Sequence, residues 1–171
     1  WEFNEATGEV TLTGLGAYLG LPKAVNAGEL PNVDVPESVT YSVMMAGNMM
    51  TVIIEAGAGV FWTFELAKEG EHHQEPIFGN WKLAPMPGAL RVGPSAGSGE
   101  WWSSSAEDVE TRACFFDDEY IFHEDGSFQN ILGNETWLEG WQGVDADQCG
   151  APVAPHDGSN PTTWEYDEAT G

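Results

Sequence analysis

Residues 1–8 read WEFNEATG, and residues 164–171 repeat them as WEYDEATG. Six of the eight positions are identical, and the other two exchange Phe for Tyr and Asn for Asp. The offset is 163 residues (164 minus 1), which suits a repeated whole domain rather than a solenoid repeat. We therefore expect one unit of a tandem array, cut inside a domain, with the same strand and turn at both ends. The alternative is a coincidence between two β-hairpin arms.

The composition indicates one acidic globular domain. The chain has 171 residues, enough for one hydrophobic core, and its 8 Trp, 8 Phe and 4 Tyr are too many for a disordered protein. Five Lys and Arg stand against 28 Asp and Glu, so the net charge is −23. This charge repels nucleic acid and anionic membranes, and we expect neither as a partner. Because five cations are too few for an acidic polysaccharide, a neutral partner is expected.

The chain has two cysteines, Cys114 and Cys149. An isolated pair of this kind predicts one disulfide in a secreted domain, whereas the alternative is two buried thiols in a cytosolic protein. A disulfide that closes this loop would stabilise the fold by roughly 3–4 kcal/mol in the chain-entropy model. We expect an extracellular or cell-surface location.

Alternating apolar residues and short turns predict an all-β, antiparallel fold. Residues 1–4 and 9–13 read as strands, and residues 38–45 and 49–55 read as a hairpin around an Ala-Gly-Asn turn. Residues 60–67 place Trp62, Phe64 and Leu66 on one inward face. Further strands are expected at residues 79–85, 119–123, 127–132 and 162–166, while residues 14–37 and 86–100 read as loops, the first with one short turn of helix. About eight strands result, without a convincing amphipathic helix, in a barrel or a jelly-roll-like sandwich.

Residues 68–76 are polar and read as a linker. We place the natural domain boundary there. Residues 1–67 are then the C-terminal half of one repeat, and residues 77–171 are the N-terminal half of the next. The two halves would form one compact β-domain, as in a circular permutant, or be exchanged between neighbouring chains.

Two Gly-containing stretches carry candidate glycan-binding residues. Sugar rings pack their C–H faces on indoles, and their hydroxyls bond to carboxylates and amides. The candidates are Trp101, Trp102, Trp137, Trp141, Glu139 and Gln142. The alternative is that these tryptophans plug the ends of the barrel, although neighbours such as Trp101 and Trp102 point to opposite faces of a regular strand.

Signals for a metal or for catalysis are weak. Candidates for a structural calcium are Asp117, Asp118, Asp145, Asp147 and Asp157, but the EF-hand pattern is absent, and the alternative is solvated turns. His72 and His73 lie in the linker without further ligands at zinc spacing. A nucleophile elbow, a phosphate loop and a dinucleotide fingerprint are also absent. We expect no cofactor other than this calcium, and no catalysis.

Residues 79–85, 114–120, 125–128, 137–142 and 149–159 resemble a module of secreted, multidomain proteins of marine bacteria, and residues 14–23 resemble the second half of that module. The module often stands beside laminarinase-type glycoside hydrolase domains. Its G-x-W-K-L opening, at residues 79–83, is similar to that of bacterial lipocalin-like domains. The resemblance covers nearly the whole chain in circularly permuted order. It implies an extracellular, glycan-binding accessory domain, and the E-x-D-x-x-E signature of laminarinases does not occur.

Two functions follow from this reading. The first is a secreted, non-catalytic domain that binds a neutral polysaccharide, such as a β-glucan, through the four tryptophans. The alternative is a structural repeat that assembles end to end with neighbouring copies, into a filament or surface layer, by strand or half-domain exchange. In the second case residues 1–8 and 164–171 would compete for one strand position, because an unpaired sheet edge is a template for another strand.

Overall fold

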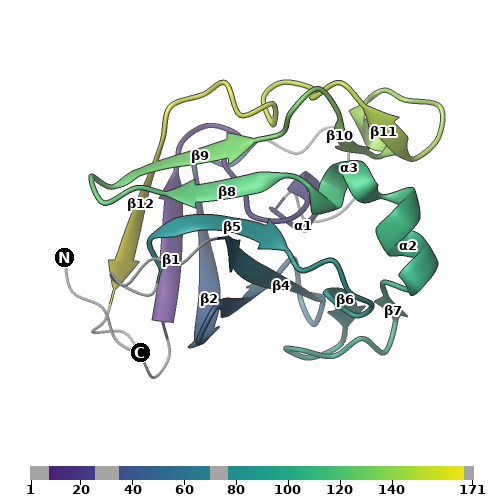
Figure 1. Ribbon diagram of the computed structural model, residues 1–171, viewed down its shortest axis with the longest axis horizontal. Helices are drawn as coiled ribbons and strands as arrows, with labels where there is room; N and C mark the ends of the chain where they lie inside the picture. Colours follow the sequence, from purple (N-terminus) through teal and green to yellow (C-terminus); the bar gives the residue numbers. More distant parts are fainter. Residues whose placement is uncertain (1–7, 26–34, 70–76, 168–171) are drawn as a thin grey trace.

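The computed structural model describes residues 8–25, 35–69 and 77–167. Eight antiparallel strands close into a barrel in the order β3-β2-β1-β12-β9-β8-β5-β4, and β4 pairs back with β3 (Figure 1). They are β1 (Gly8–Thr13), β2 (Ser38–Ala46), β3 (Met49–Glu55), β4 (Phe61–Glu69), β5 (Gly79–Leu83), β8 (Glu119–Phe122), β9 (Ser127–Ile131) and β12 (Thr162–Asp167). The prediction of an all-β antiparallel fold is confirmed, as a barrel rather than a sandwich.

Strand β4 is longer than its neighbour β5 and pairs with two strands along one edge. Its second half, from Leu66 to Glu69, pairs with β5. Its first half pairs with β6 (Leu90–Gly93), which in turn pairs with the short β7 (Trp102–Ser103). The sheet therefore continues past the closed part of the barrel. The prediction of a loop over residues 86–100 is wrong at β6, because four residues are too few to show a strand period.

The strand directions divide the barrel into two different ends. Strands β1, β3, β5 and β9 finish at one end, which we call the loop end, and every long connection among the described residues starts there. It carries α1 (Pro22–Val25), α2 (Ala106–Thr111), α3 (Ala113–Phe116), β10 (Thr136–Leu138), η1 (Gly140–Gln142) and β11 (Gln148–Gly150) (Figure 1). The opposite end, the hairpin end, carries the short turns at residues 47–48 and 123–126.

The α-helices are short, at four to six residues. The short turn of helix expected within residues 14–37 is confirmed as α1, whereas α2 and α3 were not predicted. A capping box begins α2: Ser105 Oγ accepts from the Asp108 N–H at 3.1 Å, and Asp108 Oδ2 accepts from the Ser105 N–H at 2.8 Å. This pattern is readable in the sequence, whereas the helical period is not.

The interior of the barrel is filled by side chains and by the segment that ends in α1. Leu19, Leu21 and Ala24 are buried there. The Tyr41 hydroxyl accepts from the Leu19 N–H at 2.9 Å, and the Tyr120 hydroxyl donates to the Gly20 carbonyl at 3.2 Å. These hydrogen bonds satisfy backbone groups that would otherwise be buried unpaired. Inward-facing strand residues complete the core, among them Val10, Leu12, Phe64, Leu66, Trp81, Phe122 and Trp164.

The predicted disulfide is confirmed. Cys114 of α3 and Cys149 of β11 are bonded, with a Cα–Cα distance of 6.1 Å. The bond ties the small β10–β11 sheet to the helix that precedes β8. Of the predicted linker, Lys68 and Glu69 belong to β4. Residues 70–76, with His72 and His73, and the predicted strand at residues 1–4 lie outside the described part of the chain.

Replacing Gly20 by alanine is expected to destabilise the barrel more than the same change at Gly59. Both glycines have a similar positive φ, +77° and +74°, so the backbone strain of about 1–2 kcal/mol is matched. An added Cβ at Gly20 would overlap the Phe64 ring, whereas nothing lies within 4 Å at Gly59. Overlap in a packed core costs roughly a further 1–3 kcal/mol. Urea unfolding of Gly20→Ala and Gly59→Ala measures the difference, and equal losses would contradict the close packing of Gly20 against Phe64 of β4.

Candidate functional site

A row of four apolar side chains crosses the sheet at the loop end. Ile54, Trp62, Val92 and Trp102 lie directly opposite one another on β3, β4, β6 and β7. Residues paired in this way share a face of the sheet. Because Trp62 is two residues from the fully buried Phe64, this is the inward face. The row lies where β6 and β7 extend the wall past β5, and its four members are only half-buried.

Arg112 lies between two indole rings. Its guanidinium carbon is 5.0 Å from the ring centroid of Trp102 and 4.5 Å from that of Trp137. The α2–α3 junction positions the arginine, and its Nε lies 3.8 Å from Asp108 Oδ1. Cation–π contacts of this kind are strongest where water is excluded, and Trp137 is only 6% exposed. Arg112 thus joins the half-buried row to β10.

Glu139 joins β10 to the other end of the row. Its buried carboxylate accepts from Trp141 Nε1 at 3.0 Å and from Lys23 Nζ at 3.4 Å. The Glu139 N–H donates to Gln142 Oε1 at 3.0 Å, which fixes the start of η1. The Lys23 ammonium lies 6.0 Å from the ring centroid of Trp62.

These contacts form a ring at the loop end. From Lys23 the ring passes to Trp62 and along the row to Trp102. Arg112 then connects Trp102 to Trp137. From Trp137 the ring follows β10 to Glu139, which contacts Lys23 again. We call the following residues the mouth cluster: Lys23, Trp62, Trp102, Arg112, Trp137, Glu139 and Trp141. Among the described residues, the buried Nε1 of Trp137 has no hydrogen-bond partner. The cluster therefore combines apolar ring surface, a carboxylate and an unused N–H donor.

The structure brings together five of the six predicted glycan-binding residues and separates the sixth. Trp102, Trp137, Trp141, Glu139 and Gln142 all contribute to the mouth cluster or hold it in place. Trp101 is 54% exposed and precedes β7, whereas its neighbour Trp102 packs on Arg112. Trp137 and Glu139 are buried, at 6% exposure each, so their ring and carboxylate mainly position the others.

Sequence reasoning did not place Trp62, Lys23 or Arg112 in this site. Trp62 was predicted on the inward face, together with Phe64 and Leu66. Phe64 and Leu66 are fully buried, whereas Trp62, at the start of β4, is half-buried. The sequence does contain one indication of this partial exposure. Trp62 closely follows the Gly-rich turn at residues 57–59, so it lies near the start of its strand, where a strand can extend past the closed part of a barrel. For Lys23 and Arg112 no local signal exists.

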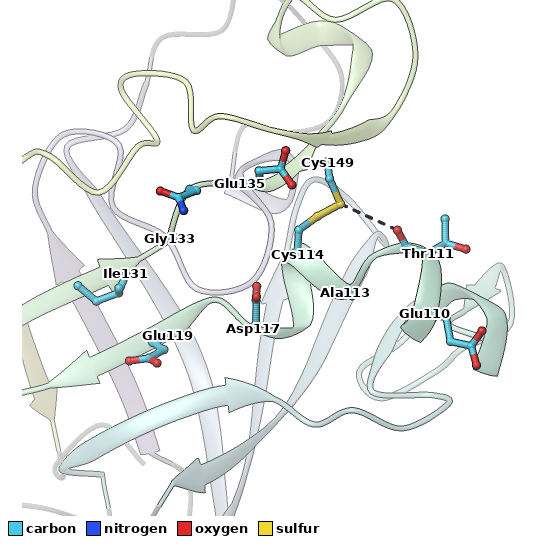
Figure 2. A pocket seen from close by; sticks show the side chains of 11 residues that line it. Glu110, Thr111, Ala113, Cys114, Asp117, Glu119, Ile131, Gly133, Glu135 and Cys149 are labelled. Atoms are coloured by element: carbon cyan, nitrogen blue, oxygen red, sulfur yellow. Dashed lines mark hydrogen bonds between the residues drawn. A yellow bond between two sulfur atoms is a disulfide. The ribbon is translucent and has the colours of Figure 1, made fainter.

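A pocket away from the mouth cluster, about 500 Å³ in volume, is acidic (Figure 2). It lies between the α2–α3 corner, the start of β8 and the segment after β9, with the disulfide on its wall. The carboxylates of Glu110, Asp117, Glu119 and Glu135 belong to residues that line it. A hydrogen bond from Asn80 and an ion pair with Lys82 hold the pKa of Glu119 below its ordinary value. None of its lining residues is aromatic, so it lacks the stacking surface of the mouth cluster.

The calcium candidates do not converge. Asp117 is exposed at the acidic pocket, and Asp118 is buried and accepts from Thr136 Oγ1 at 2.7 Å. Asp147 Oδ1 accepts from the Gly140 N–H, Asp157 Oδ1 accepts from the N–H and Oγ of Ser159, and Asp145 is exposed. In the described ranges, no group of three or more His, Cys, Asp or Glu side chains is placed to hold a metal ion.

Asp118 is the acidic group most altered by the fold. Burial raises its pKa to about 8, and the negative charge of Asp117 adds to this, while the hydrogen bond from Thr136 opposes it. At neutral pH the folded protein therefore holds a proton on this carboxyl group. Asp118 in turn contributes to the raised pKa of Tyr18 and Tyr120, where burial is the larger cause.

Comparisons with protein-family models, with curated proteins and with solved structures found no match. Within the part of the chain that the structure describes, no helix has the length and apolar character needed to cross a membrane.

The buried Asp118 predicts that stability falls as the pH rises from about 4 to about 8. Its pKa is raised in the folded state, so between the unfolded value of 3.8 and about 8 only the folded protein keeps this proton. Below pH 4 this group makes its full contribution to the free energy of unfolding. Above pH 4 the contribution falls by up to about 1.4 kcal/mol per pH unit. The measurement is urea unfolding of the wild type and of Asp118→Asn from pH 4 to 9. Because the amide cannot ionise, the wild type should lose stability relative to Asp118→Asn as the pH rises, and parallel profiles would contradict the prediction.

Proposed function

We propose that this protein is a secreted, non-catalytic domain that binds a neutral polysaccharide, with a β-glucan as the first candidate. One observation carries the proposal: the half-buried indoles of Trp62 and Trp102 lie in one row on the wall that extends past the closed barrel. Indole rings pack against the C–H faces of sugar rings. Two of them on one strip of sheet suit an extended chain of sugars.

Polar groups beside this row suit the hydroxyls of a sugar. Trp137 is 6% exposed and packs on Arg112, so its ring fixes the guanidinium beside the half-buried Trp102. Glu139 is likewise buried, and by accepting from Lys23 and Trp141 it holds these two partly buried side chains in place beside the row. Apolar ring faces with a few fixed polar groups are the usual composition of a ligand site.

The charges favour a neutral ligand over an anionic one. Every cationic side chain of the chain already contacts a carboxylate or an indole ring. Arg91 pairs with Glu65, and Lys82 pairs with Glu69 and Glu119. Lys68 lies 5.7 Å from the ring centroid of Trp81, and Lys23 and Arg112 belong to the mouth cluster. An anionic polysaccharide would have to break these contacts while approaching a chain of net charge −23.

The remaining features support an accessory role outside the cell. The Cys114–Cys149 disulfide is typical of secreted domains. The barrel interior is filled by large side chains such as Trp81, Phe64 and Tyr120, which favours a ligand at the loop end over one enclosed in the barrel. The resemblance to modules that accompany laminarinase-type enzymes points to the same substrate class.

The test replaces one half-buried tryptophan inside the mouth cluster and one exposed tryptophan outside it. Trp62→Ala removes half of the proposed platform, and Trp101→Ala is the matched control, because Trp101 is exposed but lies outside the cluster. Affinity electrophoresis through a gel that contains laminarin measures the retention. We expect Trp62→Ala to lose about tenfold in affinity, which corresponds to about 1.4 kcal/mol. Trp101→Ala and the wild type should be retained equally.

Thermal unfolding of both variants shows whether the fold is intact, and an alginate gel serves as the anionic control. Loss of retention in Trp101→Ala with full retention in Trp62→Ala would move the site to the opposite face of β7. An intact wild-type protein that no neutral glucan retains would disprove the proposed function.

A further inference from the structure

The disulfide connects the two partners of a stacked pair in the mouth cluster. Cys114 belongs to α3 and lies two residues after Arg112. Cys149 of β11 lies directly opposite Trp137 of β10. The guanidinium carbon of Arg112 is 4.5 Å from the ring centroid of Trp137. The bond therefore closes a small circuit, from Arg112 through α3 and the disulfide to β11, and across the sheet to Trp137.

Strand β10 keeps other contacts that do not involve the disulfide, whereas β11 depends on it more strongly. Thr136 of β10 donates to the buried Asp118 at 2.7 Å, and Glu139, just after β10, accepts from Lys23 at 3.4 Å. Among the described strands, β11 pairs with β10 alone, and its first residue, Gln148, is exposed. Opening the disulfide would thus free β11 and loosen β10, while the eight strands of the barrel keep their pairing.

The acidic pocket leads from solvent to the disulfide. Both cysteines line this pocket, and Figure 2 shows the bond on its wall. Cys149 is half-buried, and its Sγ lies 4.0 Å from the carbonyl oxygen of Thr111 at the end of α2. A volume of about 500 Å³ has room for a small thiol beside the bond. A thiolate that reaches one sulfur can open a disulfide, so this bond can be reduced in the folded protein.

The same pocket places negative charge in the path of an attacking thiolate. Glu110, Asp117 and Glu135 line the pocket and are exposed, and among the described residues none of the three forms an ion pair. The carboxylate of Glu119, also at the pocket, is paired with Lys82. Like charges repel one another over several ångströms in water, and salt screens this repulsion. The net charge of the attacking species should therefore control how readily it reaches the sulfurs.

We propose that the acidic pocket is a charge-selective entrance to a redox-active disulfide, which admits small cationic and neutral thiols and repels anionic ones. A thiolate attacks one sulfur and forms a mixed disulfide, and the other cysteine leaves as a thiolate that takes a proton from water. A second thiol then releases the remaining cysteine, so the products are two protein thiols and the oxidised disulfide of the reductant. Reduction frees β11 from α3, and the contact between Arg112 and Trp137 loses its covalent support.

The effect of this reduction on glycan binding rests on the proposed function, whereas the entrance and the release of β11 do not. A looser contact between Arg112 and Trp137 leaves the Trp102 ring less firmly positioned at the end of the row. A site whose aromatic surface must first be ordered binds more weakly than a preorganised one. Reduction of the disulfide therefore lowers the affinity of the mouth cluster for a neutral polysaccharide.

Reduction rates of the folded protein test the entrance. Cysteamine, mercaptoethanol and mercaptoethanesulfonate are small thiols whose thiolate forms carry no net charge, one negative charge and two negative charges. Each rate is divided by the rate with the neutral disulfide of N-acetylcysteinamide, which removes differences in thiol reactivity. Protein thiols are counted by mass spectrometry after alkylation. We expect the normalised rate to fall about tenfold from cysteamine to mercaptoethanesulfonate at low salt, and this difference to shrink as salt is added.

Charge variants separate the pocket from the overall charge of the chain. Glu110→Gln combined with Glu135→Gln removes two carboxylates from the pocket and should weaken the dependence on thiol charge severalfold. Glu107→Gln combined with Glu165→Gln is the matched control, because both residues are exposed and do not line the pocket. A normalised rate that is the same for all three thiols would overturn the proposal. So would a control variant that weakens the dependence as much as the pocket variant does.

Hydrogen exchange measured by mass spectrometry tests the release of β11. The protein reduced with cysteamine and the double variant Cys114→Ser, Cys149→Ser are compared with the oxidised wild type. We expect exchange to become at least about tenfold faster within residues 136–150 and to stay unchanged in β1, β2 and β3. Faster exchange throughout the barrel, or unchanged exchange within residues 136–150, would show that the bond is not a local link between α3 and β11.

Retention in a laminarin gel distinguishes this inference from the proposed function. The double serine variant should bind laminarin several-fold more weakly than the oxidised wild type. Equal retention of the two proteins would overturn the link between the disulfide and the glycan site. If the oxidised wild type itself is not retained, the proposed function is disproved, while the reduction rates and the hydrogen exchange still decide whether the pocket is an entrance and whether β11 is released.

Discussion

The barrel depends on the pairing of β1 with β12, because that contact closes the sheet between its first and last strands. No local signal forces it: the partners lie about 150 residues apart, as in the pair Leu12–Trp164. Once formed, it buries Trp164 against Phe78 and Phe122 and gives the interior segment that ends in α1 a complete wall to pack against. Most of the hydrophobic core is therefore assembled by a contact of very long range, and loop-closure entropy makes such a contact the slow one to form.

Ring closure also determines where function can be placed. Alternating strand directions send the long connections of the described chain to one end and leave short turns at the other. The long β4 then runs past β5 at that same end and recruits β6 and β7. The row of four apolar side chains would be buried in the core if β4 ended with β5, but here it forms a half-buried wall. Arg112 and Glu139, which belong to the long connections, close this wall into a ring. A rigid scaffold with variable loops on one side is a common way to hold a binding site.

The sequence predicts what is local and leaves out what only pairing creates. The β2–β3 and β8–β9 hairpins are predictable because alternation and a turn occur within a few residues, and with two cysteines only one disulfide is possible. Strand β6 has four residues and β7 has two, so their pairing with β4 gives no periodic signal. The same reason hides the mouth cluster. The inward direction of Trp62 is readable, but its partial exposure depends on where β5 ends, and nothing near Arg112 shows that two distant indoles will enclose it.

The scarcity of cations affects both functions expected for this chain, glycan binding and assembly of copies. Because the five positive side chains are held by carboxylates and indoles, the rest of the surface is strongly acidic and copies of the chain repel one another. A contact between copies would then depend on backbone pairing or apolar burial rather than on complementary charge. Salt screens the repulsion over about 8 Å at physiological strength, so added salt favours any association between copies. The stacking of a neutral sugar on indole involves no net charge and should change little. Salt dependence would therefore distinguish association between chains from the proposed glycan binding at the loop end of the barrel.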